Sequence, residues 1–154
     1  MIDNEKGDLH TSLKTFKNPI FKIKTKIYLI RIDELSDYNY RYAAWKVNEN
    51  ETSKPDLVLN NGQIQYEGSG GNYVITFVNG IYTYKVYRNV IGSDTSPDIT
   101  LEVEENGIII LTYLFKEKVF YPLMNSLFAT AKFIWKYHAV PDLIKTMLQV
   151  SLFL

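Results

Sequence analysis

The sequence predicts a mainly β fold: an antiparallel β-meander that forms a sandwich or a partly open barrel, followed by two C-terminal amphipathic helices. Three observations support this prediction. Apolar and polar residues alternate over much of residues 20–118, as in strands with one face toward a core. Asn-Gly pairs punctuate the same region and indicate tight hairpin turns. After residue 118, apolar residues recur at spacings of three and four, which is typical of a helix with one apolar face.

The chain has 154 residues, of which 46% are hydrophobic and 22% charged, and this composition is typical of a globular domain. Residues 1–19 are a polar lead-in with little periodicity, and we expect them to be mobile or loosely docked. Residues 20–118 form the predicted antiparallel β domain. Residues 119–154 form the predicted helical pair, which packs on the sheet or on a partner.

The first predicted strand begins at Phe21, where apolar side chains alternate with lysines as far as Leu29. This alternation indicates a strand with one solvated face. Tyr38, Tyr40 and Tyr42, followed by Trp45 and Val47, predict a second strand.

Three hairpins follow, each centred on an Asn-Gly pair, because Asn and Gly both tolerate the positive φ of a type I′ turn. Asn61-Gly62 joins residues 57–59 to 64–66, Asn79-Gly80 joins 73–78 to 81–87, and Asn106-Gly107 joins 99–104 to 108–114. Strands connected so closely must be antiparallel. We therefore expect six to eight strands in a meander.

The helical pattern begins after Lys118, and Pro141 separates the first predicted helix from the second. Pro122 suits the first turn of a helix, where its missing N–H has no intrahelical partner. The apolar stripe of the first helix consists of Phe120, Leu123, Met124, Leu127, Phe128, Ala131, Ile134 and Trp135. Such stripes must be buried against the sheet, a second copy or another protein, and we expect a protein partner or self-association through these helices.

Charge and cysteine content exclude several classes of protein. Seventeen basic residues balance seventeen acidic ones, so no net positive field attracts nucleic acid or an anionic membrane. The chain has no cysteine, which rules out disulfides and thiolate metal sites.

The longest uncharged stretch near the C-terminus, Val119–Ala131, has 13 residues and is too short to span a bilayer. The N-terminus lacks the apolar core of a secretory signal, so we expect a cytoplasmic protein.

Aromatic residues are the most unusual feature of the composition, with 12 Tyr, 8 Phe and 2 Trp. Tyrosines on one face of a strand can anchor a protein interface or stack on a sugar, although cross-strand packing in a half-buried sheet explains the same pattern. The glycine-rich loop at residues 68–72 precedes a predicted strand, and glycines allow a ligand or partner to approach the backbone closely. The predicted partner-binding residues are therefore Tyr40, Tyr42, Trp45, Tyr82, Tyr84, Gly70, Gly71 and Asn72.

We predict no catalytic residue, no cofactor and no metal site. The only histidines, His10 and His138, lie outside the strand-rich centre, and the chain has no G-x-S-x-G nucleophile motif. The preferred function is a non-enzymatic module that presents aromatics on the sheet and exposed loops to a protein partner. One alternative is a carbohydrate-binding module, which requires at least two exposed, coplanar rings on a concave surface. The other is a small hydrolase with a pair of carboxylates facing one pocket.

Overall fold

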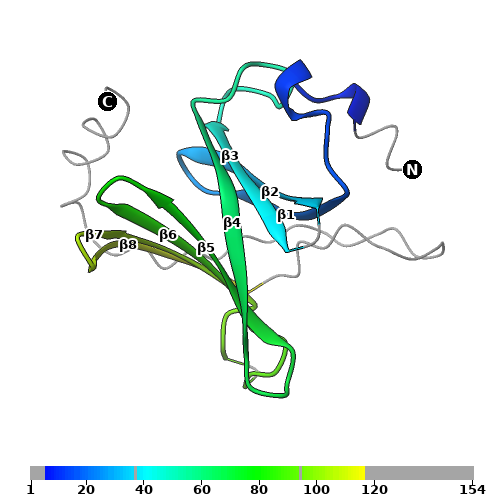
Figure 1. Cartoon of the computed structure of the whole chain (residues 1–154). Helices are drawn as coiled ribbons and strands as arrows, with labels where there is room; N and C mark the ends of the chain where they lie inside the picture. The colour runs from blue at the N-terminus through cyan, green and yellow to red at the C-terminus, as the bar shows by residue number, and fades with distance from the viewer. Residues whose placement is uncertain (1–5, 37, 94, 117–154) are drawn as a thin grey trace.

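The computed structural model describes residues 6–36, 38–93 and 95–116, whose strands form one curled, half-barrel sheet (Figure 1). Eight antiparallel strands lie in the order in which they occur along the chain. They are β1 (Asn18–Lys24), β2 (Tyr28–Ser36), β3 (Asn39–Lys46), β4 (Leu57–Glu67), β5 (Asn72–Asn79), β6 (Tyr82–Arg88), β7 (Ile99–Glu105) and β8 (Ile108–Phe115). The predicted mainly β class and the meander are confirmed. The predicted helices at 119–154 lie outside the described residues.

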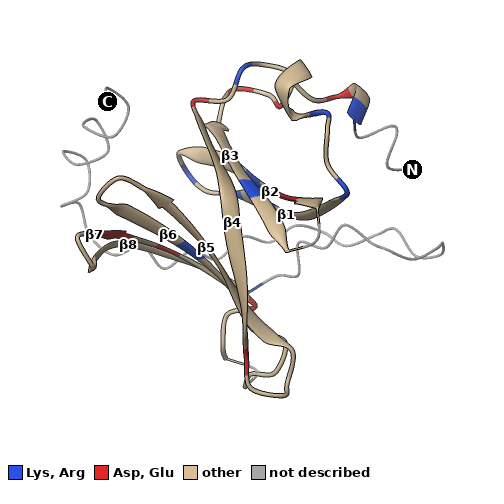
Figure 2. Cartoon of the chain, viewed as in Figure 1, with Lys and Arg blue, Asp and Glu red and all other residues tan. Residues whose placement is uncertain are grey.

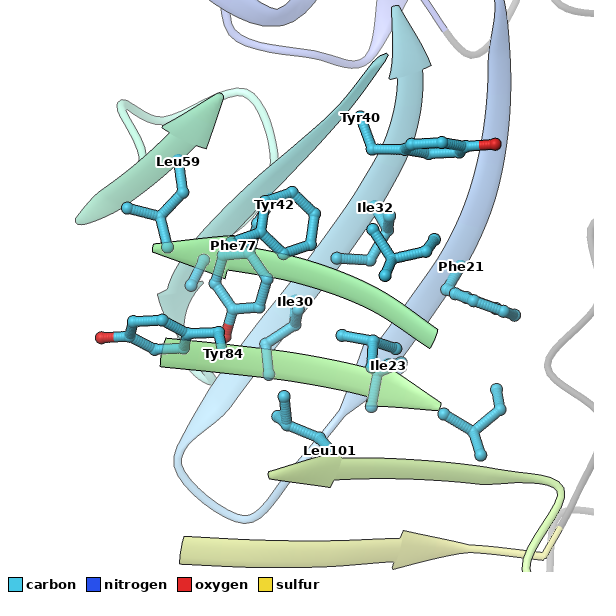
Figure 3. Close-up of a cluster of buried hydrophobic side chains, with 14 of the residues drawn as sticks. Phe21, Ile23, Ile30, Ile32, Tyr40, Tyr42, Leu59, Phe77, Tyr84 and Leu101 are labelled. Carbon is cyan, nitrogen blue, oxygen red and sulfur yellow. The ribbon is translucent and has the colours of Figure 1, made fainter. Parts of the chain in front are cut away.

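The main hydrophobic core fills the inner face of the curled sheet (Figure 3). Alternate residues of β2 and β3, such as Ile32 and Tyr42, point into it and meet alternate residues of β5–β7, such as Ile75 and Leu101. Phe21 of β1 stacks on Tyr73 of β5, with ring centroids 6.4 Å apart. The two halves of the sheet, β1–β4 and β5–β8, therefore curl toward each other and bury one shared apolar face.

β4 connects the two halves of the sheet and contains a bulge (Figure 1). Asn61 lies within this strand at a φ of 62°, and the pairing with β3 gains one extra β4 residue between Leu59 and Gly62. The extra residue changes which positions face inward, so Ile64 points to the same side as Leu59 despite the odd spacing. The predicted hairpin at Asn61-Gly62 is wrong, because this pair forms a bulge inside one continuous strand.

The single strand predicted from Phe21 to Leu29 is also wrong, because the chain turns between β1 and β2. The Thr25 hydroxyl accepts hydrogen bonds from the backbone N–H groups of Ile27 and Tyr28, at 3.1 and 2.7 Å. A threonine side chain that binds the backbone two and three residues later stabilises a turn. Apolar alternation continues across this turn, which explains why periodicity alone does not reveal it.

The other two Asn-Gly pairs occur at hairpins, as predicted. Asn106 and Gly107 both have positive φ and form the two-residue turn between β7 and β8. In the hairpin between β5 and β6, Asn79 still pairs with Tyr82, so the turn residues are Gly80 and Ile81. Only Gly80 has a positive φ, as in a type II′ turn.

The N-terminal segment covers the outer face of β2 and β3. Leu9, Leu13 and Phe16 are buried there in a second cluster with Ala43 and Trp45. This segment includes a short 3-10 helix, Thr11–Leu13. The expectation of a mobile or loosely docked lead-in is therefore wrong for residues 9–16, whose three apolar side chains are buried against the sheet.

Candidate functional site

Four of the five predicted aromatic site residues are buried inside the chain. Tyr42 and Tyr84 point into the inner core, where Tyr42 contacts Phe77 at 5.7 Å and Tyr84 at 5.5 Å between ring centroids. Trp45 is fully buried on the outer face and donates its indole N–H to the Ser53 carbonyl at 2.9 Å. Burial in the core is the packing role that the sequence analysis left open for these rings.

Tyr40 is also buried, but it lies apart from the Tyr42–Phe77–Tyr84 group, and its hydroxyl points away from that group (Figure 3). Tyr82 is half-buried, and its hydroxyl donates to the Glu105 carboxylate at 3.1 Å. That hydrogen bond raises the pKa of Tyr82. Tyr40 and Tyr82 are thus the two predicted aromatics at the margins of the core.

Tyr40 belongs to a group of four tyrosines, which we name the tyrosine cluster: Tyr38, Tyr40, Tyr66 and Tyr73. Tyr66 and Tyr73 are directly paired across β4 and β5, with ring centroids 5.9 Å apart and ring planes at 63°. Burial raises the pKa of Tyr40, and the neighbouring Glu34, Tyr66 and Tyr38 add to the increase. Burial also raises the pKa of Tyr73 to about 12.

Two members of the tyrosine cluster are exposed. Tyr38 retains 66% of its accessible surface and Tyr66 retains 59%. Tyr38 lies between β2 and β3 with a φ of 62°, the left-handed region that a bulky side chain rarely adopts. A residue other than Gly, Asn or Asp in this region costs about 1–2 kcal/mol. Such strain tends to persist where a side chain serves a function, so Tyr38 identifies this end of the sheet as a candidate site.

The predicted glycine-rich loop lies at the end of the β4–β5 hairpin, next to Tyr66. Gly70 and Gly71 are in this loop, and Asn72 begins β5. The Asn72 Oδ1 accepts hydrogen bonds from the backbone N–H groups of Val90 and Ile91, at 2.7 and 3.0 Å. Asn72 thus connects the glycine-rich loop to the segment after β6.

Charged residues gather on the outer face of β2 and β3, under the N-terminal segment, and basic and acidic positions are neighbours on β2 (Figure 2). The fully buried Asp33 carboxylate accepts a hydrogen bond from Arg31 Nε at 2.7 Å and another from Arg41 Nη2 at 2.7 Å. Burial raises the pKa of Asp33, while the two guanidinium groups act in the opposite direction.

Arg41 also donates to the carbonyls of Leu13 and Thr15, at 2.7 and 3.3 Å. The charged network therefore holds the N-terminal segment against the sheet. The Asp33 carboxylate is occupied by its two arginines and has no exposed surface, so it cannot meet a substrate.

In the part of the chain that the structure describes, few other residues could serve in catalysis or metal binding. His10 precedes the 3-10 helix, where its Nδ1 accepts from the Ser12 N–H at 3.3 Å. His138 lies outside the described residues. Across residues 6–36, 38–93 and 95–116, no three His, Cys, Asp or Glu side chains converge as metal ligands. In the same ranges, no helix has the length and apolarity needed to cross a membrane.

The sequence analysis did not single out Tyr66 and Tyr73. The glycine-rich loop closes the β4–β5 hairpin, and its register places Tyr66 directly opposite Tyr73. Comparisons of the chain with protein-family models, curated proteins and solved structures gave no significant match.

Proposed function

We propose that this chain is a non-enzymatic interaction module that binds a protein partner through the tyrosine cluster and the adjoining loop of Gly70 and Gly71. The strained, exposed Tyr38 carries the proposal. A large ring held outward at a positive φ costs stability without contributing to the core. Tyrosine is well suited to this role, because it offers a large apolar surface and a polar tip with few side-chain torsions to immobilise.

The shape of the cluster favours a protein over a carbohydrate. A sugar platform needs flat, coplanar rings, whereas the planes of Tyr66 and Tyr73 meet at 63°. Tyr40 is buried and Tyr73 is half-buried, whereas Tyr38 and Tyr66 are exposed. Exposed tyrosines such as Tyr38 and Tyr66 are among the side chains most enriched in protein interaction hot spots.

The neighbouring loop extends this surface with apolar residues. Val90 and Ile91 are 54% and 66% exposed, although their backbone N–H groups are both held by Asn72. A loop whose backbone is fixed loses little conformational entropy when it binds. The surface therefore combines rigid aromatic anchors with a preorganised apolar loop.

Site-specific photo-crosslinking in the cells that produce the chain tests this proposal. A benzophenone amino acid replaces Tyr38, Tyr66 or, as a control, Val78, which is 67% exposed on the outer face of β5. We expect the same protein adduct from positions 38 and 66 and none from position 78. Equal adducts at all three positions, or no protein adduct at 38 and 66, would contradict the proposal. Binding of a free oligosaccharide at the cluster would support the carbohydrate alternative instead.

A further inference from the structure

The three Asn-Gly pairs of the chain are identical as dipeptides but occupy three different settings in the sheet. Asn61-Gly62 lies inside β4, Asn79-Gly80 joins β5 to β6, and Asn106-Gly107 joins β7 to β8. An asparagine amide can react with the backbone nitrogen of the next residue, and glycine favours this reaction because it has no Cβ to hinder the approach. Differences in reactivity between the three pairs must therefore come from their surroundings.

The pair Asn106-Gly107 is open to the reaction. Both residues are exposed and lie outside the two strands that they connect, with φ values of 50° and 80°. A Cβ added to Gly107 would meet nothing within 4 Å, so the reacting groups have room. Among the described residues no acceptor binds the Gly107 N–H, whereas the Asn106 N–H donates to the Ile81 carbonyl at 2.9 Å. The nitrogen that has to attack the amide is thus available.

The pair inside β4 is protected. Gly62 is buried, pairs with Tyr40 across the ladder and lies against the ring of Phe77. Closure of a ring between the asparagine side chain and the next backbone nitrogen requires rotation of the asparagine ψ. Such a rotation within β4 would break ladder hydrogen bonds and displace Gly62 from its contact with Phe77.

The pair at the β5–β6 hairpin is intermediate. Asn79 is exposed, but its backbone is still paired with Tyr82. β5 and β6 also have a neighbouring strand on each side, whereas β8 pairs with β7 alone within the described ranges. A hairpin that includes an edge strand opens locally at a lower cost in free energy than one inside a sheet.

We propose that Asn106 is a site of spontaneous deamidation and that, in the folded chain, it reacts faster than Asn61 and Asn79. The backbone nitrogen of Gly107 forms a bond to Cγ of Asn106. The C–N bond of the side-chain amide breaks, and ammonia leaves with the proton from the Gly107 nitrogen. Water then adds to either carbonyl of the cyclic imide and opens it. The products are aspartate and isoaspartate, each with a carboxylate in place of the neutral amide, and water is the only co-reactant.

The products change the charge and the length of the β7–β8 turn. The new carboxylate follows Glu105 directly in the chain, and like charges repel. The Glu105 carboxylate already accepts a hydrogen bond from the Tyr82 hydroxyl at 3.1 Å. Isoaspartate also adds a carbon to the main chain of the turn, and the turn length fixes the register of a hairpin. The modified chain should therefore be less stable, and this proposal does not depend on the function of the tyrosine cluster.

Peptide mapping of the full chain by mass spectrometry tests the proposal without any substitution. The chain is incubated at mildly alkaline pH, once folded and once in guanidinium chloride, and the conversion of each asparagine to the acid is followed. In the denaturant the three sites should react at similar rates, because the dipeptide is the same. In the folded chain we expect Asn106 to react about tenfold faster than Asn61, and also faster than Asn79. Equal rates in the folded chain, or a faster reaction at Asn61 or Asn79, would overturn the proposal.

Two matched substitutions connect the reaction to stability. Asn106→Gly and Asn61→Gly each remove the amide, and glycine tolerates the positive φ of both positions. After incubation, the midpoint of urea unfolding should fall for the natural chain and for Asn61→Gly but remain unchanged for Asn106→Gly. A fall in Asn106→Gly equal to that of the natural chain would contradict the proposal. A constant midpoint in a natural chain whose Asn106 has been converted would contradict it as well.

Discussion

Asp33 and Arg41 are directly opposite each other in the β2–β3 ladder, and their side chains form a buried ion pair at 2.7 Å. Arg41 extends this contact to the N-terminal segment through the carbonyls of Leu13 and Thr15. One guanidinium thus joins two strands to a segment that lies outside the sheet. Loss of this group would leave a buried carboxylate with one arginine and two carbonyls without their donor.

Arg41→Met should therefore lower the free energy of unfolding by roughly 3–5 kcal/mol, the usual cost of breaking a buried ion pair. It should also speed amide hydrogen exchange in residues 9–16, because they lose their polar anchor. Urea denaturation and exchange mass spectrometry measure the two effects. The control is Lys85→Met, which removes a more exposed ion pair with Glu104 and should cost no more than about 1 kcal/mol. Similar losses in both variants would contradict this account.

Gly62 of the bulged strand β4 has no room for a side chain. A Cβ at this position would overlap the ring of Phe77. Gly62→Ala should destabilise the protein by about 1–3 kcal/mol through overpacking, and Gly7→Ala, which meets open space, should change little. Thermal or chemical denaturation measures both. The combination of Gly62→Ala with Phe77→Leu should be less destabilising than the sum of the two single changes, and additivity would argue against the clash.

The left-handed conformation of Tyr38 predicts that two substitutions at this position change the free energy of unfolding in opposite directions. Tyr38→Asn should raise the free energy of unfolding by about 0.5–1 kcal/mol, because asparagine tolerates a positive φ better than tyrosine does. Tyr38→Val should lower it, because a β-branched side chain is poorly accommodated there. If both substitutions shift stability in the same direction, strain at Tyr38 does not contribute to the energetics of the turn.

The raised pKa of Tyr73 predicts a loss of stability in alkali. In the unfolded chain Tyr73 ionises near its ordinary pKa of 10.0, whereas in the folded chain it stays neutral until about pH 12. Between these values the unfolded state binds fewer protons, so the free energy of unfolding falls as the pH rises. Tyr73→Phe should remove part of that fall, about 1 kcal/mol between pH 9 and pH 11. Buried Tyr42 retains its own contribution. Urea titrations at pH 9 and pH 11 compare the variant with the natural chain, and an identical slope in both would contradict the assignment.

Local signals in the sequence were sufficient for most of the fold. Asn106-Gly107 adopts the positive φ pair of a two-residue turn, and the alternation of Leu101 and Val103 with Glu102 and Glu104 on β7 matches the buried face of that strand. The hairpin predicted at Asn61-Gly62 was wrong because a bulge and a hairpin turn can both use a residue with positive φ. The choice between a bulge and a hairpin depends on whether the chain continues to pair with β3. This long-range pairing cannot be recognised from the sequence around residues 61 and 62.

The candidate site was less predictable for a related reason. Composition suggested tyrosines on the sheet, but exposure depends on how far the sheet curls. Tyr42 and Tyr84 are covered because β3 meets β6 across the core, whereas Tyr66 remains exposed at the end of a long hairpin. The curvature of the sheet depends on all of its strands together, so the exposure of a tyrosine cannot be predicted from one stretch of sequence.

The meander has a consequence for how the chain can be divided. Gly68–Gly71 is the only covalent link between a half made of β1–β4 and a half made of β5–β8, as far as the described strands go. A cut there would separate two complementary fragments, each with an unbroken series of hairpins. Reassembly would need just one backbone ladder, β4 with β5, together with the apolar interior that the halves share. The fold therefore suggests a split-protein pair, in which the association of the two fragments can be controlled by the partners fused to them.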